Sequence, residues 1–279
     1  MSTTDPFNIP LKTIAEKNGV QLQSWGEGTP LAVIPGLEGS GESCLHFIVP
    51  AIEEVSRQGS PTQLLLVNYA GEQHDSLKAL ANTVQELLHQ TLDSRELLLF
   101  SQSFGNLITA RIGNSDQLSI ERVCMVSPFK QLPPLLARIA YYSMFVTPTF
   151  LYRATIKPMG RYVFGPVGNS YKNHPFFGAL TRATSAQVRR QTGWLAGLNY
   201  EHLFSELQPE LTIILGKKDR LVNIEDEIAF FQQLCSQSNN RKLLLNDNSG
   251  HVVLLKNEIK WLKETLLTFL KHQDVVKEH

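Results

Sequence analysis

The chain has 279 residues, more than the ~100 to 200 of most single domains, but a length that an α/β domain with an insertion reaches. Its 26 Lys and Arg residues balance 26 Asp and Glu residues. This balance excludes the strongly basic field with which proteins gather the phosphates of DNA or RNA. We therefore expect no nucleic-acid partner.

Cys44, Cys124 and Cys235 are odd in number, widely separated and not arranged in any zinc-binding spacing. They predict neither a disulfide framework nor a metal site. The first ten residues, MSTTDPFNIP, contain neither the basic segment nor the apolar segment of a secretory signal peptide. On this basis we expect a cytoplasmic protein.

The first predicted element is an antiparallel hairpin, because Asn18-Gly19 separates two short alternating runs. Short apolar runs then recur along the chain, too short for helices and too continuously apolar for strands with one exposed face. They predict strands covered on both faces at 31–34, 63–68, 96–101, 122–127, 211–216 and 242–246.

Helical patterns alternate with these runs. Apolar residues recur on one helical face at 75–90 and again at 259–270. Alternating strands and helices are typical of a mostly parallel central sheet with helices on both faces. Between residues 128 and 205 no strand pattern appears, and the sequence is rich in aromatic residues and punctuated by prolines.

The run at 97–101 leads directly into SQSFG, residues 101–105. Ligands of parallel sheets collect beyond the carboxyl ends of the strands, which is where Ser103 lies. A sharp strand-to-helix turn there would hold the serine above the sheet, with small neighbours at Ser101 and Gly105. The N-terminus of the following helix would favour a developing negative charge near Ser103.

These residues resemble the nucleophile elbow, G-x-S-x-G, of the α/β-hydrolase superfamily, with Ser101 in place of the first glycine. The resemblance covers roughly residues 30–128 and 206–271. It implies a catalytic triad in the chain order Ser, Asp, His. Asp219, after the run at 211–216, and His251, in the motif Gly-His before an apolar run, match the other two positions.

The resemblance also implies an oxyanion hole in which two backbone N–H groups bind the developing charge. Phe104, directly after Ser103, would supply one of them. The glycine-rich loop PGLEGSG would supply the other from Leu37, next to Gly36, which is expected to contact the substrate. Pro35 stands where many family members have histidine, so other groups must replace the hydrogen bonds of that histidine.

The family inserts a cap between the two matching segments. We therefore predict a core domain made of residues 1–128 and 206–279 and a cap made of residues 129–205. Two interpretations of the apolar cap residues remain open. In the first, they pack as ordinary core. In the second, some of them line an acyl pocket or lie at a membrane surface. The pocket candidates are Tyr142, Phe145 and Phe150, and the basic residues that would flank a membrane contact are Arg138, Arg153, Lys157 and Arg161.

The leading functional hypothesis is a serine hydrolase that cleaves a carboxylic ester with an apolar acyl or alcohol group, without a metal or organic cofactor. A thioesterase is a close alternative. A non-catalytic binding or receptor protein with the same fold is another, although it would not need all three triad residues. A proton-abstracting lyase is a third, since a fold does not specify its substrate.

Overall fold

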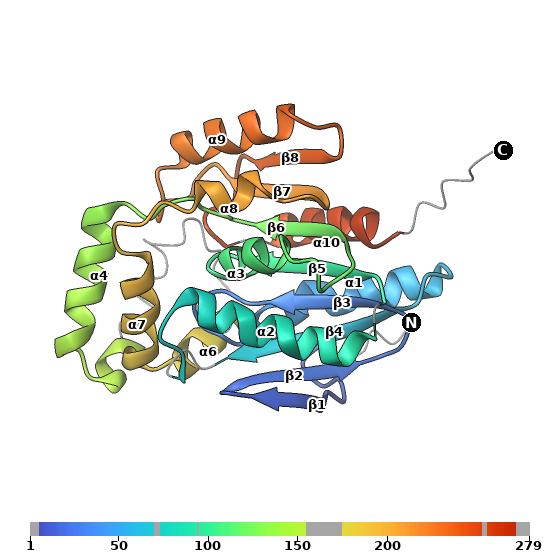
Figure 1. The fold of residues 1–279 in the computed structure, drawn as a ribbon, viewed down its shortest axis with the longest axis horizontal. Helices are drawn as coiled ribbons and strands as arrows, with labels where there is room; N and C mark the ends of the chain where they lie inside the picture. The colour runs from blue at the N-terminus through green and yellow to red at the C-terminus, as the bar shows by residue number, and fades with distance from the viewer. Residues whose placement is uncertain (1–5, 70–72, 94, 155–174, 253–255, 272–279) are drawn as a thin grey trace.

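A single mixed sheet forms the centre of the computed structural model, which describes residues 6–69, 73–93, 95–154, 175–252 and 256–271 (Figure 1). Its eight strands lie in the order β1-β2-β4-β3-β5-β6-β7-β8. Their bounds are β1 (Lys12–Lys17), β2 (Val20–Trp25), β3 (Thr29–Ile34), β4 (Thr62–Tyr69), β5 (Leu97–Gln102), β6 (Ile120–Val126), β7 (Glu210–Gly216) and β8 (Arg241–Asn246).

The N-terminal hairpin is confirmed. Strands β1 and β2 pair antiparallel around Asn18 and Gly19, both of which have positive φ, at 47° and 70°. Two consecutive positive φ angles are the geometry of the tight hairpin turn that Asn-Gly favours. Strand β2 also pairs antiparallel with β4, and every later pairing in the sheet is parallel.

The predicted strands all form, but one is not covered as expected. All six residues of β5 are buried, as its position between β3 and β6 requires. Strand β8 contains two exposed and three half-buried residues. The expectation that residues 242–246 are covered on both faces is therefore wrong, because β8 lies at the edge of the sheet and pairs with β7 alone.

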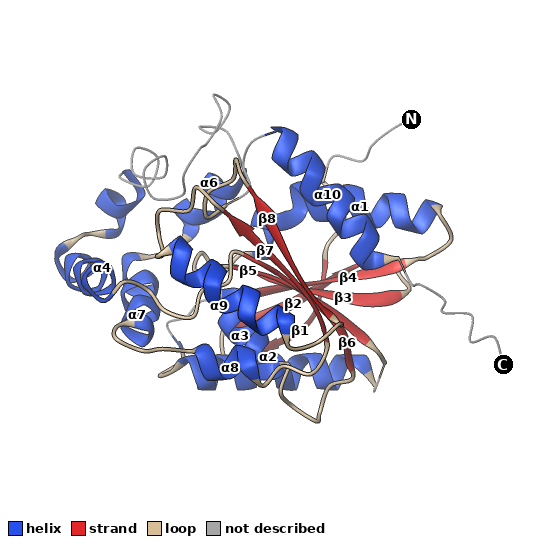
Figure 2. Ribbon diagram, turned by 90° about the horizontal axis from the view of Figure 1, so that it is seen from above, coloured by secondary structure: helices blue, strands red, loops and turns tan. Residues whose placement is uncertain are grey.

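Helices cover both faces of the sheet (Figure 2). Helices α1 and α10 pack together on one face, where their apolar residues share a core with one side of the strands. Helices α2, α3, α8 and α9 bury their apolar residues in the larger core on the other face. Their bounds are α1 (Leu45–Arg57), α2 (Leu77–Leu92), α3 (Gly105–Ile112), α8 (Glu201–Ser205), α9 (Ile224–Ser236) and α10 (Lys256–Leu270).

Helices α4 (Pro134–Val146), α6 (Pro175–Arg182) and α7 (Ser185–Leu195) also lie between β6 and β7, in the segment predicted as the cap. Helix α4 packs against α7 and forms the outer edge of the molecule (Figure 1). The two ends of the segment meet, because the N–H of Tyr200 donates to the carbonyl of Lys130 at 2.8 Å. Lys157 and Arg161 lie outside the described residues.

Candidate active site

The turn after β5 holds Ser103 in a backbone conformation that non-glycine residues rarely adopt, with φ 53°. Its N–H donates to the carbonyl of Val126 on the neighbouring strand at 2.9 Å, which fixes the turn. The turn is also tight. A Cβ atom at Gly105 would lie 2.3 Å from the carbonyl oxygen of Pro35, so only glycine fits there.

Ser101 stands in place of the first glycine of the elbow pattern, and a buried hydrogen bond satisfies its hydroxyl group. Its hydroxyl donates to Oδ1 of Asn106 at 2.7 Å, and Nδ2 of Asn106 donates to the carbonyl of Val126 at 2.9 Å. The polar side chain is thereby satisfied in a fully buried position, where an unpaired hydroxyl would be costly. The same bonds connect β5, β6 and α3 around the turn.

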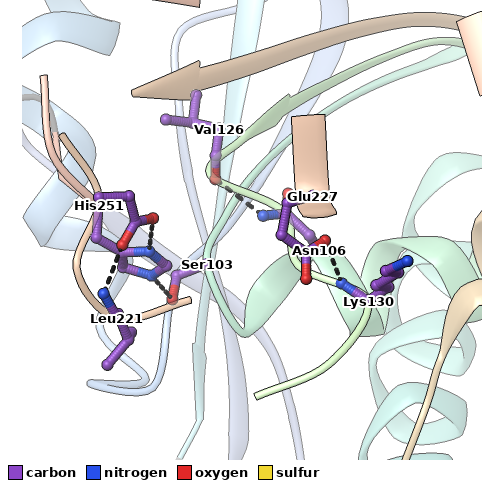
Figure 3. A network of polar contacts seen from close by, with 8 residues as sticks. Ser103, Asn106, Val126, Lys130, Leu221, Glu227 and His251 are labelled. Carbon is purple, nitrogen blue, oxygen red and sulfur yellow. Dashed lines mark hydrogen bonds and ion pairs between the residues drawn. The ribbon is translucent and has the colours of Figure 1, made fainter. Parts of the chain in front are cut away.

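Ser103, His251 and Asp219 lie together although they come from three separate loops, and Figure 3 shows Ser103 beside His251. Oγ of Ser103 is 2.7 Å from Nε2 of His251. Nδ1 of His251 is 2.6 Å from Oδ2 of Asp219. Because a carboxylate oxygen only accepts, Nδ1 carries the proton and Nε2 is left to accept the hydroxyl hydrogen of Ser103.

The carboxylate is held from a second side. The N–H of Leu221 donates to Oδ1 of Asp219 at 2.8 Å, so each oxygen of Asp219 has its own donor. The side chains of Asp219 and His251 are each only 1% exposed. Exclusion of water strengthens such hydrogen bonds, and these bonds hold the imidazole in its orientation.

The loops that carry Asp219 and His251 are fastened to each other. The N–H of Lys217 donates to the carbonyl of Asn246 at 2.8 Å, and that of Lys218 donates to the carbonyl of Ser249 at 2.9 Å. A Cβ atom at Gly216 would lie 2.3 Å from the carbonyl oxygen of Gly250, so glycine permits this close approach. Parallel pairing of β7 with β8 thus brings both residues to the same edge of the sheet.

The predicted oxyanion donors also border this site. Leu37 and Phe104 line the same pocket as Ser103. In the part of the chain that the structure describes, neither backbone N–H donates to another protein group. Gly36 lies directly against the serine, since a Cβ atom on it would be 3.3 Å from Cβ of Ser103. It is not among the residues that line the pocket.

Glu38 is a site residue that the sequence did not reveal. Its Oε1 accepts from the hydroxyl of Ser43 at 2.7 Å and from the N–H of Gly36 at 3.3 Å, and its side chain borders the pocket. Burial raises the pKa of this carboxyl above its ordinary value, and the hydrogen bond from Ser43 partly opposes the shift. The only signal in the sequence was an acidic residue inside a glycine-rich loop.

Glu38 and Tyr69 hold the loop that begins at Pro35. The hydroxyl of Tyr69 lies 2.8 Å from the carbonyl oxygen of Pro35 and 2.6 Å from that of Gly36. The loop is therefore held from the sheet by Tyr69 and from within by Glu38. Leu37 lies in the loop that these contacts hold.

A pocket of about 320 Å³ opens above Ser103 and His251. Its walls are mostly apolar, with Leu221 and Val252 from the predicted core, Phe129 at the start of the segment predicted as the cap, and a larger set of residues from the rest of that segment. Those residues are Leu132, Leu136, Ala137, Ile139, Ala140, Ser143, Met144, Tyr152, Val188, Thr192 and Leu195.

The three aromatic residues predicted to bind substrate do not line this pocket. Tyr142, Phe145 and Phe150 are 66%, 54% and 74% exposed. Helix α4 is apolar around most of its circumference, so its sequence alone does not show which face turns inward. The inward face carries smaller or flexible residues such as Ala140 and Met144, and the three aromatic residues point outward.

Two further properties concern ligands and membranes. Among the described residues, no cluster of three or more His, Cys, Asp or Glu side chains has the arrangement of a metal site. Within the same ranges, no helix has both the length and the apolar character needed to cross a bilayer.

The sequence matches no protein-family model and no curated protein. Solved structures are nevertheless similar over nearly the whole chain. An esterase from Exiguobacterium antarcticum has a TM-score of 0.75 at 15% identity, covering 90% of this chain and 95% of its own. A bromoperoxidase from Bacillus anthracis has a TM-score of 0.73 at 17% identity, with coverages of 90% and 95%. An enol-lactonase from Burkholderia xenovorans has a TM-score of 0.70 at 14% identity, with coverages of 94% and 99%.

Proposed function

We propose that this chain, which has the α/β-hydrolase fold, is a serine hydrolase that cleaves a carboxylic ester with an apolar acyl or alcohol group. The observation that carries the proposal is the continuous hydrogen-bonded series from Ser103 through His251 to Asp219 at the base of an apolar pocket. A serine hydroxyl needs such a base to become nucleophilic, and the base needs a partner that fixes its tautomer.

In the acylation step, Oγ of Ser103 attacks the ester carbonyl carbon while its proton passes to Nε2 of His251. The carbonyl oxygen becomes an oxyanion, and the N–H groups of Leu37 and Phe104 bind it. Each such donor contributes about 3 to 4 kcal/mol to transition-state stabilisation in related chemistry. Asp219 stabilises the imidazolium that forms.

The tetrahedral intermediate then collapses. The bond between the carbonyl carbon and the alcohol oxygen breaks, and His251 returns its proton to the leaving alcohol. In deacylation, His251 removes a proton from water, which attacks the acyl group on Ser103. The carboxylic acid leaves and the proton returns to Ser103.

The pocket supports an apolar substrate group. A volume of about 320 Å³ accommodates a medium acyl or alcohol chain, and the walls above Ser103 offer few polar groups to bind a charged one. Glu38 is the one acidic side chain among the lining residues, and it is engaged by Ser43 and Gly36. Each methylene buried there would contribute about 0.8 kcal/mol.

Hydrolysis of a series of p-nitrophenyl esters from acetyl to octanoyl, together with hexanoyl coenzyme A as a thioester, tests the proposal. We expect activity that rises from acetyl to at least hexanoyl esters and is lost in Ser103→Ala. Ser205→Ala, an exposed serine on α8, is the matched control and should retain full activity. Hydrolysis by a folded Ser103→Ala protein at the wild-type rate would refute the assignment.

A further inference from the structure

Charge is unevenly distributed along the chain. Residues 129–200 contain no Asp or Glu, although the whole chain balances 26 acidic against 26 basic residues. The remainder of the chain therefore carries all the acidic residues and 17 of the basic ones. The nine basic residues within 129–200 are Lys130, Arg138, Arg153, Lys157, Arg161, Lys172, Arg182, Arg189 and Arg190.

Exposed apolar side chains gather in the same segment. Of the eleven large apolar residues that are exposed in the described ranges, seven lie between positions 135 and 151. Leu135, Ile139, Tyr142 and Val146 follow one another at the three- and four-residue spacing of a single helical face. Leu135 is 71% exposed and Val146 is 82% exposed, so no element among the described residues covers this face of α4.

The position of α4 makes this face available. Its opposite side packs on α7 and roofs the pocket, and the helix forms the outer edge of the molecule (Figure 1). Phe145 on the same helix, and Phe150 and Leu151 shortly after its end at Val146, are exposed as well. We call these seven residues, from Leu135 to Leu151, the outer α4 surface. Isolated exposed apolar residues are common, but a contiguous group of this kind marks an interaction site.

Arginines lie beside the outer α4 surface. A cleft of about 480 Å³ between α4 and α7 is lined by Arg138, Arg189 and Arg190, and none of the described residues that line it is acidic. The guanidinium of Arg189 lies 4.4 Å from the ring centre of Phe145. Arg190 donates to the carbonyl of His74, which anchors one wall of the cleft to the core. An anionic group in this cleft would meet positive charge and aromatic rings together.

We infer that the outer α4 surface docks on an anionic lipid surface. An apolar helical face flanked by cations and free of acidic residues is the combination that binds a membrane interface, since the apolar side chains enter the acyl boundary and the arginines bind lipid phosphates. A protruding helix edge fits a deformable bilayer better than a second folded protein, which would need a matching groove.

The docking surface is continuous with the pocket. Ile139 lines the pocket above Ser103 and is itself 57% exposed on the outer α4 surface. A molecule leaving the acyl region would therefore meet the rim of the pocket at this residue. Docking does not depend on the proposed hydrolysis, because none of its residues takes part in the chemistry.

Flotation of the full chain with lipid vesicles tests this inference. The vesicles contain phosphatidylcholine alone or phosphatidylcholine mixed with phosphatidylglycerol. We expect binding to the mixed vesicles, weakened by added salt, and at least tenfold weaker binding to the neutral ones. The double variant Leu135→Ser, Val146→Ser should bind the mixed vesicles at least tenfold more weakly. Arg138→Gln should weaken binding roughly fivefold.

Matched controls lie on β8 at the far edge of the sheet. Leu245→Ser and Lys242→Gln remove an exposed apolar residue and an exposed cation there, and neither should change vesicle binding. Thermal unfolding of each variant verifies that it is folded. Equal binding to neutral and anionic vesicles would overturn the inference, as would binding that survives the double variant. If the chain binds neither vesicle but self-associates, and if Val146→Ser abolishes that self-association, this surface is instead assigned to a second copy of the chain.

Discussion

The floor and the roof of the pocket are built in different ways. On the floor, Ser103, Asp219 and His251 each follow a parallel strand, and all three are joined by hydrogen bonds within the core. The roof is formed largely by one face of α4 and by α7, which contribute mostly apolar side chains. The sheet topology therefore fixes the chemistry of the floor, whereas the rotation of a single helix decides which residues meet the substrate.

If the floor carries the chemistry, the largest loss of activity should follow removal of the base. We expect His251→Ala to lower kcat for ester hydrolysis at least ~1000-fold, because Ser103 then has no proton acceptor. The thermal midpoint of unfolding and steady-state rates are the measurements. His202→Ala, an exposed histidine on α8, is the control that should leave kcat unchanged.

The oxyanion loop joins floor and roof, and Glu38 is expected to position it. Glu38→Ala should lower kcat roughly 10- to 100-fold with little change in KM, since the N–H of Leu37 loses its orientation. Glu38→Gln should restore most of the rate. It keeps an oxygen that accepts from Ser43 and Gly36, and burial already favours the uncharged form of this carboxyl by raising its pKa. Equal rates for the Ala and Gln variants would rule out this positioning role.

Roof substitutions should change specificity rather than the rate of the chemical step. Met144 lines the pocket and Tyr142, two positions away, points outward. We expect Met144→Ser to flatten the rise in kcat/KM from acetyl to hexanoyl esters, by up to about fourfold for each methylene. Tyr142→Ser should preserve the rise. The opposite pattern would show that the outward aromatic residues, and not the inner face of α4, contact the substrate.

The junction between roof and floor should make the stability of the protein depend on pH. Burial raises the pKa of Glu227 to about 7, and its carboxyl accepts from the N–H of Lys130 at 2.9 Å (Figure 3). The folded state holds this proton more tightly than the unfolded state, in which the carboxyl has its ordinary pKa of 4.5. The free energy of unfolding therefore falls as the pH rises from 4.5 to about 7. Glu227→Gln should therefore gain stability relative to the wild type between pH 5 and pH 8, as measured by chemical denaturation at both values. A difference in the free energy of unfolding between variant and wild type that is the same at both pH values would contradict the raised pKa.

Most of the floor was predictable from the sequence. Short apolar runs set the strands, and parallel strands bring the loops after them to one edge of the sheet. Together with the resemblance to the α/β-hydrolase superfamily, this placement let Ser103, Asp219 and His251 be predicted as one site from motifs nearly 150 positions apart. Nothing in the local sequence showed that Glu38 turns back onto its own loop, because that contact depends on Ser43 in the following turn.

The roof was less predictable for a physical reason. A helix that is apolar on nearly every face has no polar side to mark the solvent, so its sequence did not show that Tyr142 and Phe145 lie outside the pocket above Ser103. Helix α1 was not identified from the sequence, and it contains Pro50, which cannot donate one of the helical hydrogen bonds. Its burial against α10 compensates for that loss.

The central claim is that Ser103 is an activated nucleophile. Treatment with a fluorophosphonate, followed by intact-mass measurement and peptide mapping, tests it directly, because only a serine with a working base displaces the fluoride rapidly. We predict one phosphonyl adduct on the peptide that contains Ser103, no adduct on Ser103→Ala and greatly slowed labelling of His251→Ala. An unmodified wild-type protein, or an adduct that persists on a folded Ser103→Ala variant, would contradict the claim.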